Sequence, residues 1–296
     1  MKAGVGSFAK GFEHGFHGHG SNGQANKGER REMRKNLMLA FALAAVLSLG
    51  VAAVASAVST TLRAGNLVVT FGGSTSPKAL PKKTYTPVTT NIFGKITTSD
   101  GTHPSAFREA VVDIDKDVKV NVKGFPACKA GQLEARDTKA AMKVCGNTVL
   151  GKGNAEVEIA FPEQNPIKVP SPLTVFNGGE SGGKVTLLIH IFITVPAPTA
   201  VVTKVTITRK GSGIHSVAKI PVVAGGSGSG LNFNFNLGKT YSYKGKKVGY
   251  FEAKCPDGVF KVNTPKVLFK NEASTPGVAA TTVLKGGLAV PCTPKG

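Results

Sequence analysis

The stretch Leu-Asn-Phe-Asn-Phe-Asn-Leu, residues 231–237, decides the fold class of this chain. Its apolar side chains alternate with asparagines, so a strand would place every apolar side chain on one face and every asparagine on the other. A helix would scatter both kinds around its axis. The stretch therefore predicts a β-strand with one dry face and one wet face.

The same period recurs elsewhere in the chain. Residues 118–123 alternate valine with lysine or asparagine, and residues 155–161 alternate apolar with mostly polar side chains. Residues 185–195 (VTLLIHIFITV) are apolar on both faces and rich in β-branched side chains, which indicates a central strand buried on both sides. Only residues 131–144 favour a helix. Further strands are predicted at 67–71, 88–97, 110–115, 201–209, 215–223, 248–254, 258–269 and 278–284.

These strands, separated by turns rich in Gly and Pro, predict an all-β protein. We expect a β-sandwich, jelly-roll-like or immunoglobulin-like, with one short helix and preceded by an N-terminal hydrophobic helix. Two sandwiches stay open as an alternative, with a seam near 170–172 or 178–183. The expected organisation is a disordered Gly/His-rich basic tail (1–36), a signal peptide or membrane anchor (37–57), a linker (58–84) and the β-sandwich domain (85–296).

The hydrophobic segment predicts export. Residues 37–58 are 22 consecutive positions without a charge, and a cluster of basic residues precedes them. That length suits a membrane anchor, whereas the small-x-small pattern ending at Ala57 suits cleavage of a signal peptide. A start at Met33 instead of Met1 would produce a signal peptide of ordinary length. Both interpretations place the chain after Val58 outside the cell, at the surface or in the extracellular space.

All four cysteines follow this segment, and an even number of exported cysteines predicts two disulfides. Four cysteines allow three connectivities, and we favour the pairing of neighbours in the sequence because each pair brackets a compact unit. The cysteines are Cys128, Cys145, Cys255 and Cys292.

The charge is uneven. The chain has 37 basic and 17 acidic residues, for a net charge of +20, and residues 182–251 hold nine bases and no acid. Such a surface predicts attraction to an anionic cell-wall polymer or to a membrane surface. Specific nucleic-acid binding is disfavoured because lysine dominates over arginine and no binding motif occurs. The alternative is that these lysines only keep a β-rich protein soluble. The candidate polyanion-binding residues are Lys204, Arg209, Lys210, Lys219, Lys239, Lys244, Lys246 and Lys247.

Two stretches resemble enzyme or metal-binding motifs, but the sequence around each does not provide what the motif requires. Residues 179–183 match the Gly-x-Ser-x-Gly pattern of hydrolases, but a β-forming run follows where a helix is required. Residues 113–117 resemble the start of a calcium loop and lack its Gly and its final Glu. His190 suits a buried neutral histidine with one hydrogen bond. We therefore predict no catalytic residue, cofactor or metal site. If the protein were a hydrolase, its carboxylates would come from Glu156, Glu158, Glu163, Glu252 and Asp257.

Several motifs resemble those of a group of exported, β-rich actinobacterial proteins that has no assigned function. The motifs are residues 79–83 (ALPKK), the segment 128–145, residues 160–164 (AFPEQ), residues 255–258 (CPDG) and residues 291–296 (PCTPKG). The resemblance covers about residues 78–296 and implies no activity. We expect an exported, non-enzymatic structural or binding module of the cell surface or extracellular space. The alternative is a secreted hydrolase or carbohydrate-active enzyme on a β-sandwich.

Overall fold

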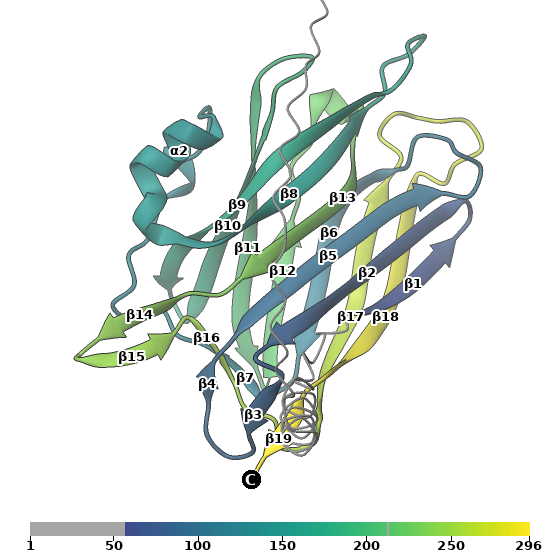
Figure 1. The fold of residues 1–296 in the computed structure, drawn as a ribbon. Coiled ribbons are helices and arrows are strands. Elements are labelled where there is room, and N and C mark those ends of the chain that lie inside the picture. Colours follow the sequence, from purple (N-terminus) through teal and green to yellow (C-terminus); the bar gives the residue numbers. More distant parts are fainter. Residues whose placement is uncertain (1–56, 212) are drawn as a thin grey trace, which may run out of the picture. The chain divides into compact units, whose positions relative to one another are not determined.

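A computed structural model describes residues 57–296 with the exception of residue 212, and these residues belong to one compact unit. The predicted tail and almost all of the hydrophobic segment lie outside the described residues. The described part is almost entirely antiparallel β structure with one short α-helix, so the prediction of an all-β protein is confirmed (Figure 1).

The elements have the following bounds. The strands are β1 (Val58–Ala64), β2 (Leu67–Ser76), β3 (Ala79–Pro81), β4 (Thr86–Pro87), β5 (Thr89–Thr98), β6 (Ala106–Ile114), β7 (Val118–Val120), β8 (Val149–Ile159), β9 (Ile167–Ser181), β10 (Lys184–Ile193), β11 (Thr199–Lys210), β12 (Gly213–Lys219), β13 (Gly228–Leu237), β14 (Thr240–Tyr243), β15 (Lys246–Gly249), β16 (Phe251–Ala253), β17 (Val259–Lys270), β18 (Thr281–Pro291) and β19 (Thr293–Lys295). The helices are α2 (Thr138–Cys145) and the short 3-10 turns η1 (Ala130–Gln132), η2 (Gly146–Thr148) and η3 (Ala224–Gly226).

Twelve strands form one antiparallel sheet in the order β1-β2-β5-β13-β8-β9-β10-β11-β12-β6-β17-β18. The sheet curls round until its two edge strands, β1 and β18, lie side by side (Figure 1). Strands twist in one direction, so a sheet of this many strands curls or splits. The curled sheet has an inner and an outer face, and residues along each strand alternate between them.

This architecture differs from the expected sandwich. The strands do not divide between two facing sheets, because β13 joins β5 to β8 and β6 joins β12 to β17 in one continuous sheet. Residues 58–84, expected to be a linker, form β1, β2 and β3 instead. The two proposed seams between domains, 170–172 and 178–183, fall within β9 and its hairpin to β10.

Small elements close the end of the curled sheet at which β6 and β18 finish (Figure 1). Strands β4, β16 and β7 form a three-stranded sheet there, and β3 pairs with β19 in parallel. The disulfide Cys255–Cys292 ties the segment after β16 to the end of β18. The N–H of Cys255 donates a hydrogen bond to the Pro81 carbonyl oxygen over 2.9 Å, so β3 is attached to the segment that carries this disulfide.

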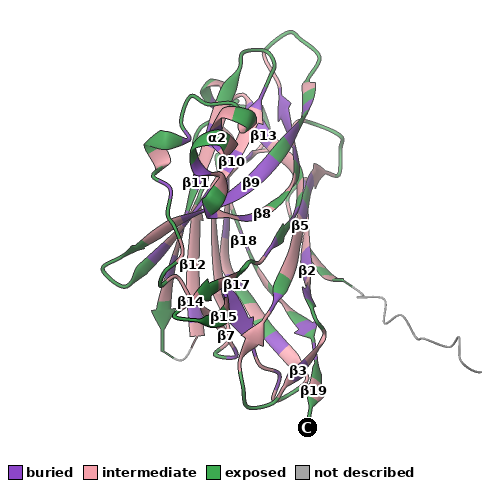
Figure 2. Cartoon of the chain, turned by 60° about the vertical axis from the view of Figure 1, so that its left-hand side comes forward, coloured by how far each residue is buried: buried purple, intermediate pink, exposed green. Residues whose placement is uncertain are grey.

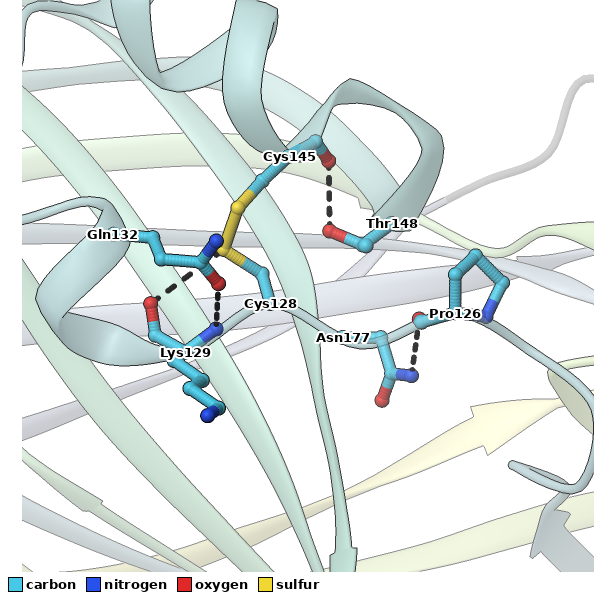
Figure 3. Close-up of a disulfide and its surroundings, with 7 residues drawn as sticks. All are labelled: Pro126, Cys128, Lys129, Gln132, Cys145, Thr148 and Asn177. Atoms are coloured by element: carbon cyan, nitrogen blue, oxygen red, sulfur yellow. Dashed lines mark hydrogen bonds between the residues drawn. A yellow bond between two sulfur atoms is a disulfide. The ribbon is translucent and has the colours of Figure 1, made fainter.

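Helix α2 covers the outer face of β9 and β10. Asp137 caps the helix by accepting a hydrogen bond from the Ala140 N–H over 2.7 Å. The disulfide Cys128–Cys145 joins the C-terminal end of α2 to the chain before η1, and Phe176 and Leu188 pack beneath it. Figure 3 shows this disulfide beside the side chain of Asn177, which donates to the Pro126 carbonyl oxygen over 2.7 Å.

The helix is shorter than residues 131–144 predicted. Its N-terminal half runs through η1 and a turn in which Ala135 has a positive φ, so a continuous helix cannot form there. The prediction of a central strand is confirmed for residues 185–193, since β10 pairs with β9 and β11, borders the cavity on one face and contributes Leu188 to the cluster beneath α2 on the other. The strand ends at Ile193, and Val195 is exposed. No helix within residues 57–296, residue 212 aside, is long and apolar enough to cross a membrane.

Candidate functional site

The inner face of the curled sheet encloses a cavity of about 440 Å³. This volume lies within the range of roughly 300–1,000 Å³ that is usual for small-molecule sites. Most of the residues that border it are aliphatic or aromatic, and they come from eleven of the twelve strands of the sheet and from β7 and β16. Figure 2 shows buried and intermediate residues along the strands, whereas the connecting loops are mostly exposed.

The alternation in residues 231–237 builds one part of this wall. Phe233, Phe235 and Leu237 border the cavity, while the asparagines between them face outward. On the outer face the Asn91 side-chain amide donates to the side-chain oxygens of Asn234 and Asn236 over 2.7 and 3.2 Å. From Phe233 to Leu237 the predicted apolar and polar faces are therefore the inside and outside of the curled sheet, whereas Leu231, at an irregularity in the pairing of β13 with β8, does not border the cavity.

Two glycines border the cavity at positions where a side chain would change the space inside it. A Cβ at Gly94 would lie 2.5 Å from the Phe233 ring, so the ring rests directly on the backbone of β5. Gly230 on β13 lies opposite Val157, and a Cβ added to it would meet nothing within 4 Å. A larger side chain at Gly230 would therefore enter space that is open.

The three-stranded sheet at the lower end of Figure 1 forms the floor of the cavity. Val118, Val120 and Phe251 border the cavity from this sheet. Behind them, the Lys119 ammonium lies 2.8 Å from the Glu252 carboxylate. Burial raises the pKa of Glu252, but hydrogen bonds from Lys119 and from the Gly249 N–H outweigh it, so the pKa is lowered overall. This partly buried ion pair joins β16 to β7.

A charged group lies at the opposite end. Arg108 borders the cavity and is 8% exposed. Its guanidinium donates to both carboxylate oxygens of Glu272, with 2.8 Å between Nε and Oε1, and also to the Pro221 carbonyl oxygen. Glu272 lies between β17 and β18 and Pro221 follows β12, so this one side chain joins two connecting loops.

Few polar groups face the interior. Thr203, Ser216 and Thr264 border the cavity, and the Thr264 hydroxyl is buried with no hydrogen-bond partner among the described residues. An apolar lining with a small number of polar groups is the usual composition of a site that binds a small organic molecule.

The predicted disulfide pairing is confirmed: Cys128 bonds Cys145, and Cys255 bonds Cys292. No cysteine among the described residues is free. Disulfides persist in oxidising compartments, so the two bonds indicate an oxidising, extracellular environment.

The basic residues do not form one continuous patch. Lys204 lies directly opposite Lys219 on the outer face of β11 and β12, and Arg209 and Lys210 lie at the end of β11. The other four lie on or next to the hairpin of β14 and β15, which projects from the curled sheet in Figure 1. These four are Lys239, Lys244, Lys246 and Lys247.

The five carboxylates named for a hydrolase do not come together, although Glu156 and Glu158 both lie on β8. Glu156 accepts from the Asn232 amide over 2.7 Å, Glu158 lies 2.7 Å from His103 Nδ1, and Glu252 pairs with Lys119 at the floor. Glu163 lies in the loop after β8 and Asp257 in the turn before β17. Of these five, only Glu156 borders the cavity, and its side chain faces outward.

The hydrolase-like serine lies in a hairpin. Ser181 ends β9, Gly182 and Gly183 form the turn with positive φ, and β10 begins at Lys184. The nucleophile elbow needs a helix after the serine, and a strand stands in that place.

The aspartates that resemble a calcium loop have separate partners. Asp113 lies 2.6 Å from His215, Asp115 accepts from the Asp117 and Lys261 N–H groups, and Asp117 lies 3.4 Å from Lys254. They therefore stabilise the end of β6 and its loop.

Sequence reasoning missed the cavity and Arg108. The signal in the sequence was the spacing of two between Arg108, Ala110, Val112 and Ile114, although the pairing of β6 with β17 is irregular at Arg108 itself. The cavity itself arises from the curvature of the sheet, and the alternation of apolar and polar residues does not predict that curvature.

Comparison with known proteins finds no matching family model, curated relative or solved structure.

Proposed function

We propose that the protein is an exported, non-enzymatic binding protein that holds an apolar small molecule inside its curled sheet. The observation that carries the proposal is the cavity of about 440 Å³ with its almost entirely apolar lining. Transfer of apolar surface from water into such a space is favourable, and an apolar wall offers few groups for chemistry. Export is supported by the two disulfides and by the hydrophobic segment that begins at Leu37.

The cavity supports a carrier or a sensor of apolar molecules outside the cytoplasm. Such molecules are poorly soluble in water, so they need a protein interior to cross an aqueous space. The floor of β4, β16 and β7 separates the cavity from solvent at one end. The protein would enclose its ligand without requiring any reaction.

The experiment is a titration with phenylnaphthylamine, an uncharged probe whose fluorescence rises in apolar surroundings. We expect saturable binding to the wild-type protein. Gly230→Leu should weaken it at least about tenfold, because the added side chain enters the open space beside Gly230. Thr206→Leu is the matched control, since Thr206 lies between the inward-facing Val205 and Ile207 and faces outward. Absence of saturable binding, or equal loss in both variants, would remove the proposal.

A second candidate function is attachment to an anionic cell-wall polymer, supported by the lysines of the β14–β15 hairpin. Lys244, Lys246 and Lys247 lie close together there and are exposed. Exchange of all three for Gln should lower retention on isolated cell walls at low salt, and added salt should release the wild-type protein. Exchange of Lys204, Lys219 and Lys210 for Gln is the charge-matched control on another surface. Equal retention of all three proteins would contradict a role for the hairpin.

A further inference from the structure

Arg108 borders the cavity near the start of β6, next to Phe107, which borders it too, and the pairing of β6 with β17 is irregular at this position. Ala110, Val112 and Ile114 precede the cavity floor on the same face of β6. Lys95 and Glu156 also border the cavity, but each alternates with inward-facing neighbours and faces outward. A single cation therefore lies at one end of an otherwise apolar space.

The guanidinium still has hydrogen-bonding capacity. It carries five N–H donors in a planar fork. Nε and one terminal nitrogen donate to the Glu272 carboxylate, and the other terminal nitrogen donates to the Pro221 carbonyl oxygen. One N–H on each terminal nitrogen remains without a hydrogen bond to the described residues. Because Arg108 is only 8% exposed, these donors gain from an acceptor inside the cavity.

Glu272 reaches Arg108 from outside the cavity. It follows β17 in the loop that leads to β18, and its side chain is 22% exposed, against 8% for Arg108. It does not border the cavity, whereas Arg108 does. The loop has its own support, since the Asn271 amide donates to the Thr275 and Val278 carbonyl oxygens over 2.9 and 3.1 Å. Glu272 can therefore leave the guanidinium without unfolding a strand.

We infer that the ligand is a single-chain amphiphile with a carboxylate head, such as a long-chain fatty acid, and that its carboxylate binds Arg108 in exchange for Glu272. This inference rests on the proposed function. Glu272 shows that this guanidinium binds a carboxylate in the two-point geometry that it prefers. Because Glu272 lies outside the cavity, a carboxylate inside the cavity would bind through the terminal N–H groups that Glu272 and Pro221 leave free, and the guanidinium would turn from Glu272 toward it. The apolar chain would extend past Phe233 and Phe235 toward the floor.

The chemistry of the site disfavours a cationic or an uncharged head group. An ammonium group would be repelled by Arg108, and an uncharged hydroxyl would not replace the charge of Glu272. A cavity of about 440 Å³ also suits one chain better than the two of a membrane phospholipid.

The experiment compares hexadecanoic acid with hexadecanol, which share a chain length and differ in charge, by displacement of the bound uncharged probe near neutral pH. Arg108→Gln should weaken binding of hexadecanoate about tenfold or more, because a charge-assisted hydrogen bond is lost. It should leave binding of hexadecanol within about twofold. Glu272→Gln keeps Arg108 and removes the competing negative charge, so it should tighten binding of hexadecanoate about threefold or more.

Glu109→Gln is the matched control. Glu109 is the next residue on β6, and its carboxylate pairs with Lys266 over 3.2 Å on the outer face. It should change neither affinity. Equal affinities of acid and alcohol in every variant would overturn the inference while leaving the proposed function intact. Failure of the uncharged probe and of both amphiphiles to bind would overturn the proposed function itself. If Arg108→Gln does not fold, Glu272→Gln alone tests the inference. If the Arg108–Glu272 pair had only a structural role, the loss of the Glu272 charge would not tighten binding of hexadecanoate.

Discussion

Single buried polar residues hold the outer layer of this protein in place. His190 on β10 is fully buried beneath α2, and its Nε2 lies 2.9 Å from the Arg136 carbonyl oxygen. Nε2 therefore carries the proton, and Nδ1 is buried without a partner among the described residues. Burial lowers the pKa of the imidazole below its ordinary value of 6.5, although the Arg136 carbonyl and the Asp137 carboxylate oppose this.

The lowered pKa predicts loss of stability in mild acid. The unfolded chain binds a proton near pH 6.5, whereas the folded chain resists protonation until a lower pH. The contribution of His190 is therefore complete above about pH 6.5 and is lost as the pH falls through the folded pKa. Urea unfolding from about pH 7 to about pH 5 should show a falling free energy of unfolding.

His190→Gln should reduce that slope, because Gln keeps an N–H donor for Arg136 and does not titrate. His215→Gln is the control, since His215 is partly exposed and paired with Asp113 on the outer face. The same slope in the wild-type protein and in His190→Gln would contradict this account.

Among the elements, the edge strands β1 and β18 set how the curled sheet closes. They lie side by side, yet no backbone hydrogen bond joins them within the described residues. Leu62 of β1 packs on Gly286 of β18, where a Cβ would lie 2.8 Å from the leucine Cδ2. Side-chain packing therefore closes the seam, and a glycine makes the close approach possible.

Gly286→Val should open this seam. The added methyl groups would displace Leu62, and we expect a loss of about 1–3 kcal/mol in the free energy of unfolding. Amide hydrogen exchange should also rise in β1 and β18 relative to β10. Gly230→Ala is the control, because its Cβ would meet open space. Equal stability of the two variants would show that the seam does not depend on this contact.

For the whole molecule, the structural unit begins where the hydrophobic segment ends. Strand β1 starts at Val58, directly after the small-x-small pattern, so there is no spacer of the expected kind. All of the core clusters and both disulfides lie after this point. Residues 58–296 therefore hold hydrophobic core clusters and both disulfides of their own.

A chain that starts at Val58 should consequently fold by itself under oxidising conditions. Far-ultraviolet circular dichroism should show β structure, and peptide mapping without reduction should recover Cys128 with Cys145 and Cys255 with Cys292. Replacement of the shorter disulfide, Cys128–Cys145, by serines should cost about 3 kcal/mol in the free energy of unfolding. Mixed disulfides in the short chain, with native pairing in the full chain, would contradict independent folding.

The sequence by itself determined the class of structure and much of its local detail. Alternation predicted strands such as β10 and β13 and separated dry from wet faces, because the period of two is a property of each strand alone. The even number of cysteines after the hydrophobic segment predicted two disulfides, and the favoured pairing of neighbours is confirmed. The sequence also showed that the enzyme-like motifs lack the neighbours they need, since a β-forming run follows residues 179–183 and the Gly and final Glu of a calcium loop are missing after residues 113–117.

Only the tertiary structure decided that these strands form one curled sheet and that its inside is hollow. β13 pairs with β5 and β8, which lie far from it in the sequence. Each alternating strand could bury its apolar face equally well in a sandwich. The spacing of Arg108 does not reveal its partner, because Glu272 is brought to it by the pairing of β6 with β17. Curvature, closure and long-range ion pairs depend on which strands meet, and that choice minimises the exposed apolar surface of the whole chain rather than of any one segment.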